Sequence, residues 1–224
     1  MKTVKIIFLI IVILIFNSNT GQSQTINWAS LKQEQKHIAN VIAGFDYGFT
    51  YGVGYGHQLR AKFPIVLNVE ISQPAGNKMA DDFKTKIGGQ ILLYEINNFH
   101  FTASVQSVFR RFENDYVRLI NFGSDMSAIV GYYKPKWFVS GEFGFDKAIV
   151  THFKHSNLFR ENFPSVRNGW YEPATGGNFH YGLQTGFSFN RMDIAFKIGK
   201  VVQQDFKTDP TIPFYFQVGL NRRF

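Results

Sequence analysis

Charged side chains that could do chemistry recur at alternate positions of segments that have the pattern of strands. Glu142 and Asp146 lie four residues apart within 137–153, so they share one face of an extended chain. The full set predicted for this face is Asp46, Glu70, Asp125, Glu142 and Asp146, with Lys86, Arg110 and Lys197 as counter-charges. Such groups can select a solute, relay protons, or neutralise one another in a polar interior. We favour mutual neutralisation of the charges. If the strands close into a narrow barrel, as the pattern described below predicts, its interior is polar and filled by side chains.

Two histidines near the end of the same segment are the other candidates for chemistry. His152 and His155 would point to opposite faces of a strand, so they converge only if a loop begins between them. Glu161 or Glu172 could then add a ligand, but the spacing matches no recognised zinc motif, and we predict no metal and no cofactor. The acid–base candidates for a hydrolase are His152, His155, Glu172 and Asp205, although no nucleophile motif accompanies them.

The elements that carry these residues follow a period of two from residue 41 onward. Aromatic and aliphatic residues alternate with glycine and polar residues, most clearly over 45–56 and 179–189. Three Phe pairs on one face are ten residues apart: Phe99/Phe109, Phe179/Phe189 and Phe214/Phe224. Ten residues rise about 33 Å along a strand. Tilted by about 40°, they span roughly 25 Å, the height of the apolar band between the aromatic girdles of a membrane barrel.

Turn signals divide this region into about nine strands. The predicted strands are 41–59, 64–72, 83–96, 99–111, 116–133, 137–153, 178–190, 193–206 and 214–224. Tight turns at 97–98, 134–136 and 190–192 alternate with longer connections at 73–82, 112–115, 154–177 and 207–213. Because single-chain barrels have an even number of strands, one segment is split or merged, or residues 25–40 add a strand. The prediction is therefore an all-β, up-and-down antiparallel transmembrane barrel of eight to ten strands over 41–224.

The N-terminal residues differ in character from the barrel region. Residues 1–23 contain two lysines, an apolar run over 6–16 and a polar tail, which predicts a secretory signal peptide cleaved before Gln24. Residues 24–40 look more helical, with a weak capping box at Ser30 and Gln33. Such a helix could plug the barrel or lie at its mouth. Its expected face is Trp28, Leu31, Gln35 and Ile38.

The composition excludes several classes of protein. The 224 residues include 25 Phe and 10 Tyr, which is too aromatic for a disordered chain, and no Cys, which excludes a disulfide framework. The formal net charge is +8. The basic residues lie at turns and tails rather than in a dense run, so we predict no nucleic-acid partner.

In the last eleven residues, 214–224, Phe214, Phe216, Val218, Leu220 and Phe224 fall on one face of a strand, and the stretch ends on an aromatic residue. The insertion signal is predicted at Phe216, Val218, Leu220 and Phe224. A terminal strand of this pattern resembles the insertion signal of small bacterial outer-membrane β-barrels. The resemblance implies export to the outer membrane, contact with its lipid, and recognition of the terminal strand by the barrel-assembly machinery.

The resemblance does not decide between two classes of function. The first is a non-enzymatic barrel with a mostly filled polar lumen, either porin-like or with a surface-binding or structural role. Its contact with a small solute, glycan or protein would lie on loop 154–177, at Trp170, Tyr171 and Glu172. The alternative is an outer-membrane hydrolase, similar to barrel proteases or lipid deacylases in architecture alone.

Overall fold

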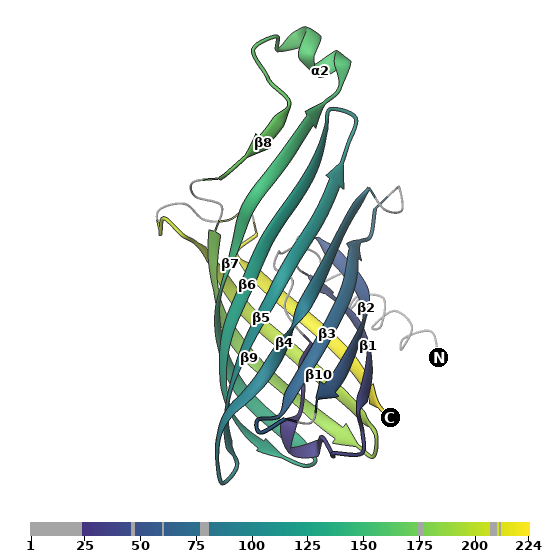
Figure 1. The fold of residues 1–224 in the computed structure, drawn as a ribbon, viewed down its shortest axis with the longest axis vertical. Helices are drawn as coiled ribbons and strands as arrows, with labels where there is room; N and C mark the ends of the chain where they lie inside the picture. Colours follow the sequence, from purple (N-terminus) through teal and green to yellow (C-terminus); the bar gives the residue numbers. More distant parts are fainter. Residues whose placement is uncertain are drawn as a thin grey trace, which may run out of the picture.

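The computed structural model describes residues 24–45, 48–59, 61–76, 81–173, 177–206, 210 and 212–224. Its main element is a closed antiparallel barrel of ten strands, drawn with its axis close to vertical in Figure 1. The wall strands are β1 His37–Phe45, β2 Phe49–Leu59, β3 Ile65–Pro74, β4 Asp82–Ile96, β5 Phe99–Glu113, β6 Val117–Lys134, β7 Trp137–His155, β9 Gly177–Phe189, β10 Met192–Gln203 and β11 Phe214–Arg223. Each wall strand pairs with its neighbour in sequence, and β1 closes the barrel against β11. The predicted all-β, up-and-down barrel of eight to ten strands is thus confirmed as a fold.

The predicted strand 41–59 is wrong, because it merges two strands. β1 ends at Phe45 and β2 begins at Phe49, and the two pair along their length from Phe45↔Phe49 to His37↔His57. The three-residue connection preserves the alternation of aromatic residues, so the pattern continues through the turn. Gly48 has a φ of +151°, which favours glycine. This split makes the strand number even.

The two ends of the barrel differ in their connections. Two-residue turns at 97–98, 135–136 and 190–191 lie at one end, hereafter the tight-turn end, as predicted. The opposite end, hereafter the long-loop end, carries the connections after β3, β5, β7 and β10. There β5, β6 and β7 rise above the rest of the wall, and the short strand β8 Gly169–Tyr171 pairs with β7 (Figure 1).

A single-turn helix, α2 Asn157–Asn162, lies above β7 in the same region. The Ser156 side chain caps it by accepting a hydrogen bond from the Phe159 amide at 3.2 Å. Within the described part of the chain, no helix combines the length and the apolar character that crossing a membrane requires.

Side chains of the wall alternate between an apolar outward face and a polar inward face. Val53, Leu183 and Ile198 face outward and are 59–60% exposed. Aromatic rings gather in two groups on the outward face. Near the tight-turn end, Tyr132 contacts Phe99 and Trp137, with ring centroids 5.2 and 5.7 Å apart. Nearer the long-loop end, Phe109 contacts Phe83 and Phe122 at 5.8 and 5.2 Å.

The helix predicted over 24–40 is reduced to one 3-10 turn, Trp28–Ser30, and residues from His37 onward belong to β1. Instead, the segment 24–36 enters the tight-turn end of the barrel, where Ile26 and Trp28 join a buried cluster with Val66, Leu92 and Phe138. Ser30 does not act as a helix cap, because its hydroxyl donates to the Asn27 carbonyl at 2.9 Å. The segment therefore plugs the lumen without being a helix.

Candidate functional site in the lumen and at the long-loop end

The middle of the lumen holds a charged cluster built from facing strands. Lys86 Nζ lies 2.5 Å from Asp125 Oδ2, and Lys197 Nζ lies 3.5 Å from Glu142 Oε2. Glu70 lies directly across the β3–β4 ladder from Lys86. All five side chains belong to residues no more than 5% exposed. These five residues are buried on the inward face of the wall, and opposite charges lie together there.

The other three residues predicted for this set have different surroundings. Asp146 accepts a hydrogen bond from Asn178 Nδ2 at 3.3 Å on the neighbouring strand. Arg110 lies nearer the long-loop end and donates to both oxygens of Asp82, at 3.0 and 2.7 Å, so its described carboxylate partner is outside the predicted set. Asp46 lies outside the described residues.

His180 is a member of this cluster that the sequence reasoning did not select. It is 1% exposed, and its Nε2 lies 3.9 Å from Asp125 Oδ1 and 4.0 Å from Glu142 Oε1. The ring occupies the space over Gly144, where an added Cβ would stand 2.2 Å from Nε2. The alternation over 179–189 places His180 inside, but no spacing signal links it to carboxylates on β6 and β7.

The tight-turn half of the lumen is closed by aromatic rings. Tyr133 stacks between His100 and Phe138, with centroid distances of 4.9 and 5.2 Å. Tyr133 and Phe138 are at most 2% exposed. Tyr133 and Phe138 belong to the same buried cluster as Ile26 and Trp28 of the plug.

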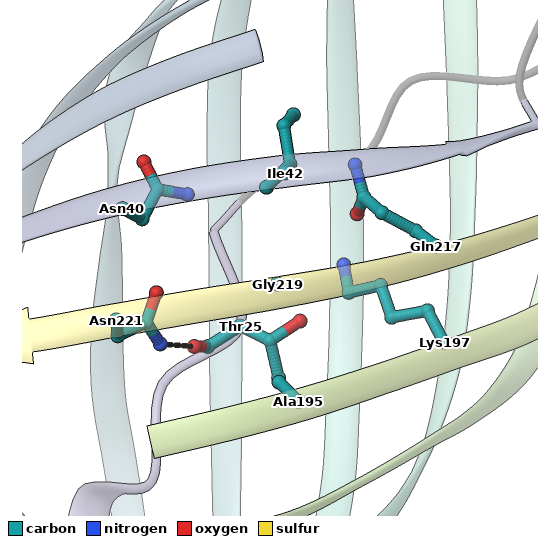
Figure 2. Close-up of a pocket in the computed structure, with 8 residues that line it drawn as sticks. All are labelled: Thr25, Asn40, Ile42, Ala195, Lys197, Gln217, Gly219 and Asn221. Carbon is teal, nitrogen blue, oxygen red and sulfur yellow. Dashed lines mark hydrogen bonds between the residues drawn. The ribbon is translucent and has the colours of Figure 1, made fainter. Parts of the chain in front are cut away.

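Hydrogen bonds attach the plug to the wall. Asn221 Nδ2 donates to the Thr25 carbonyl at 2.6 Å, as drawn in Figure 2, and Gln90 Nε2 donates to the Gln24 carbonyl at 2.5 Å. Arg223, the last residue of β11, donates to the Ser30 carbonyl, to Gln35 Oε1 at 3.0 Å and to the Asn190 carbonyl at 2.9 Å. Asp193 lies 3.1 Å from the same guanidinium. The terminal strand is thus also the plug's main anchor.

A small cavity separates the plug from the charged cluster. Figure 2 shows Thr25 facing Gly219, with Lys197 and Gln217 on the other side of the space. Its volume is about 10 Å³, which is room for about one water molecule.

The predicted binding residues of loop 154–177 do not share one surface. Trp170 and Tyr171 are consecutive in β8, so they point to opposite faces of the raised strands. Trp170 lies on the outward face, 4.9 Å from the His152 ring and 6.2 Å from the Phe122 ring. Tyr171 lies on the inward side, 5.4 Å from the Phe153 ring. Glu172 follows β8 and is exposed.

Tyr171 and Phe153 help to form a pocket of about 420 Å³ on that inward side. The remaining lining residues are Thr151, His155, Val166, Arg167 and Pro173. A pocket of this size is in the range that holds small ligands. Apolar atoms make up most of its lining, and the Tyr171 hydroxyl donates to the Arg167 carbonyl at 3.1 Å beside it.

The rim histidines have aromatic and amide neighbours. His155 Nδ1 lies 3.1 Å from Asn168 Oδ1, and its ring stacks on Phe159 at 5.3 Å. His152 packs edge-on against Trp170. Across the described residues, no three His, Asp or Glu side chains gather in a way that could hold a metal ion. Among the described contacts, neither His152 nor His155 is paired with a carboxylate as the hydrolase alternative would require.

Comparison with known proteins gives no assignment. No protein-family model matches the chain, and no curated protein matches it. A functional assignment therefore depends on the geometry described above.

Proposed function

We propose that this chain is an integral, non-enzymatic outer-membrane β-barrel with a sealed lumen, and that it acts as a surface-binding protein at its long-loop end. The observation that carries the proposal is the inverted distribution of polarity across the wall. Outward Val53, Leu183 and Ile198 are 59–60% exposed, whereas inward Lys86 and Lys197 are at most 3% exposed. Large contiguous apolar surfaces are rare on soluble monomers, and lipid is the solvent that favours this arrangement.

The spacing of the two aromatic groups supports a membrane position. Phe99 faces Tyr132 across the β5–β6 ladder, and Phe109 faces Phe122 ten residues further along β5. This separation corresponds to roughly 25 Å along the axis of a tilted barrel, the height of the apolar band of outer-membrane barrels. The predicted signal peptide and the predicted insertion signal on β11 favour the outer membrane, and the lipid and the barrel-assembly machinery would be the chain's partners there.

The packed lumen argues against a diffusion pore. The plug, the stacked rings and the charged cluster occupy successive levels of the interior, and the cavity between plug and cluster has room for about one water molecule. The pocket beside Tyr171 is instead open at the long-loop end. A small solute or a glycan with an apolar face and an anionic group, or a protein side chain of the same character, is the kind of ligand it suits.

Single-channel recording on the mature chain, residues 24–224, tests this proposal. We expect inserted protein with little or no conductance, and insertion is verified in the same bilayers by protease protection. A large, stable, voltage-independent conductance would overturn the sealed-lumen proposal and indicate a diffusion pore. A variant lacking 156–174 is the companion: conductance only in this variant would show that the loop is a lid rather than a binding surface.

A further inference from the structure

The raised strands carry a group of charged side chains on their outward face, close to the long-loop end. We call Arg111, Glu113, Arg118 and Lys154 the outer basic cluster. Glu113 pairs with Arg118 across β5–β6, and Arg118 pairs with Lys154 across β6–β7. Residues on a strand two or four apart share a face, so Arg111 and Glu113 continue the face of Phe109. The cluster therefore lies directly beyond the aromatic group formed by Phe83, Phe109 and Phe122.

The contacts within this cluster leave an excess of positive charge. Glu113 Oε2 accepts a hydrogen bond from Arg111, and Arg118 donates to both Glu113 oxygens at 3.0 and 3.1 Å. One carboxylate thus orients two guanidinium groups, and Lys154, which is exposed, adds a third cation. The side chains of Arg111 and Arg118 remain 28% and 41% exposed. Three cations against one carboxylate make the cluster net positive by two charges.

The height of the cluster matches the level of lipid headgroups. A strand tilted by about 40° rises roughly 2.5 Å per residue along the barrel axis. Arg111 therefore lies about 5 Å beyond Phe109, and the Glu113–Arg118 level lies about 10 Å beyond it. The headgroup layer begins at the edge of the apolar band and is roughly 5–8 Å thick, so Arg111 lies within it. Arg118 and Lys154 start just beyond its outer edge, from where their long side chains can extend back to the phosphate level. Trp170, in ring contact with Phe122 and His152, lies at the same level, where tryptophan is favoured.

From these positions we infer that the outer basic cluster binds the phosphate groups of anionic lipids. The inference rests on the proposed membrane position. Guanidinium groups form paired hydrogen bonds with phosphate oxygens, and Glu113 holds both arginines in place for such contacts. A lipid is favoured over a soluble anion because the cations continue an outward apolar and aromatic surface, against which acyl chains would pack.

Native mass spectrometry of the mature protein in neutral detergent tests the inference. The probes are phosphorylated lipid A and the same lipid after removal of its phosphates. We expect the parent to retain the phosphorylated form preferentially. A surface cation contributes about a fivefold preference for an anionic lipid, so Arg111→Gln/Arg118→Gln/Lys154→Gln should lose roughly a hundredfold. Arg222→Gln, at an exposed position on the outward face of the tight-turn end, is the control and should lose no more than the roughly fivefold preference of a single surface cation.

Three other results would be decisive. Equal retention of both lipids by the parent, or an undiminished preference in the triple variant, would overturn the inference. If the triple variant does not fold, Lys154→Gln alone replaces it, since this exposed side chain should still account for a severalfold loss. Failure of the parent to insert into neutral phosphatidylcholine vesicles would instead refute the membrane position itself.

Discussion

Arg223 offers a sharp test of how the plug is held, because its neighbour Arg222 is a matched control. Arg223 points inward and is 2% exposed, whereas Arg222 is exposed on the outward face of the same strand. Arg223→Met removes the donors to Ser30, Gln35 and Asn190. It also leaves the carboxylate of Asp193, 2% exposed, without its guanidinium partner at 3.1 Å.

The expected cost follows from that environment. Breaking a buried ion pair by removing one partner costs about 3–5 kcal/mol of unfolding free energy. Asp193 is 2% exposed, but Gln35 and Asn190, two other partners of Arg223, line an open pocket at the tight-turn end, so we place Arg223→Met at about 3 kcal/mol. Arg222→Met should stay within about 0.5 kcal/mol. Adding Asp193→Asn to Arg223→Met should recover part of the loss, because the uncompensated charge is then removed.

Two assays separate stability from plug position. Urea unfolding in detergent micelles gives the free energy. Because the chain contains no Cys, Ala29→Cys provides a unique thiol in the plug for labelling by a water-soluble maleimide. Labelling should be slow in the parent background and fast with Arg223→Met. Unchanged stability together with equally slow labelling in Arg223→Met would refute the anchoring role.

Three further predictions follow from the register and packing. Leu183→Arg, on the outward face, should cost about 2–4 kcal/mol of refolding stability in lipid. Gln184→Arg should cost less, because Gln184 faces Glu142 in the lumen. Equal costs for the two variants would mean that the register is wrong. Deletion of Phe224 should strongly lower assembled barrel in the outer membrane, whereas Asn221→Ala should assemble well, and equal assembly of the deletion and the parent would exclude the terminal signal. Gly144→Ala should cost about 1–3 kcal/mol by displacing the His180 ring. Gly141→Ala, whose added Cβ meets nothing closer than 4.0 Å, should be nearly neutral in the same urea titration.

The faces of the strands could be predicted from the sequence because a period of two is a local signal. That alternation placed Glu70, Lys86 and Lys197 on the inward side before any pairing was known. The partners could not be predicted in the same way, since they depend on register between distant strands. Lys86 meets Asp125, 39 residues away, and no local pattern encodes that distance.

Two features of the chain could not be predicted because their local patterns fit more than one structure. The turn between Phe45 and Phe49 keeps the aromatic alternation in phase, so one long strand and two short ones look alike. Residues 24–40 look more helical than extended because Trp28, Leu31, Gln35 and Ile38 recur at helical spacing. In the structure, the first three of those residues lie along an irregular segment whose polar groups bond to the wall at Asn221 and Arg223, and Ile38 lies in β1.

The proposal that this chain is an outer-membrane barrel is tested most directly by membrane fractionation, combined with electrophoresis of boiled and unboiled samples. We expect the mature protein to be recovered with outer membranes and to require detergent for extraction. Unboiled samples should migrate faster on electrophoresis than boiled ones, because the closed barrel stays folded in detergent. Recovery of the mature protein from the soluble periplasm without detergent would contradict the proposed outer-membrane location.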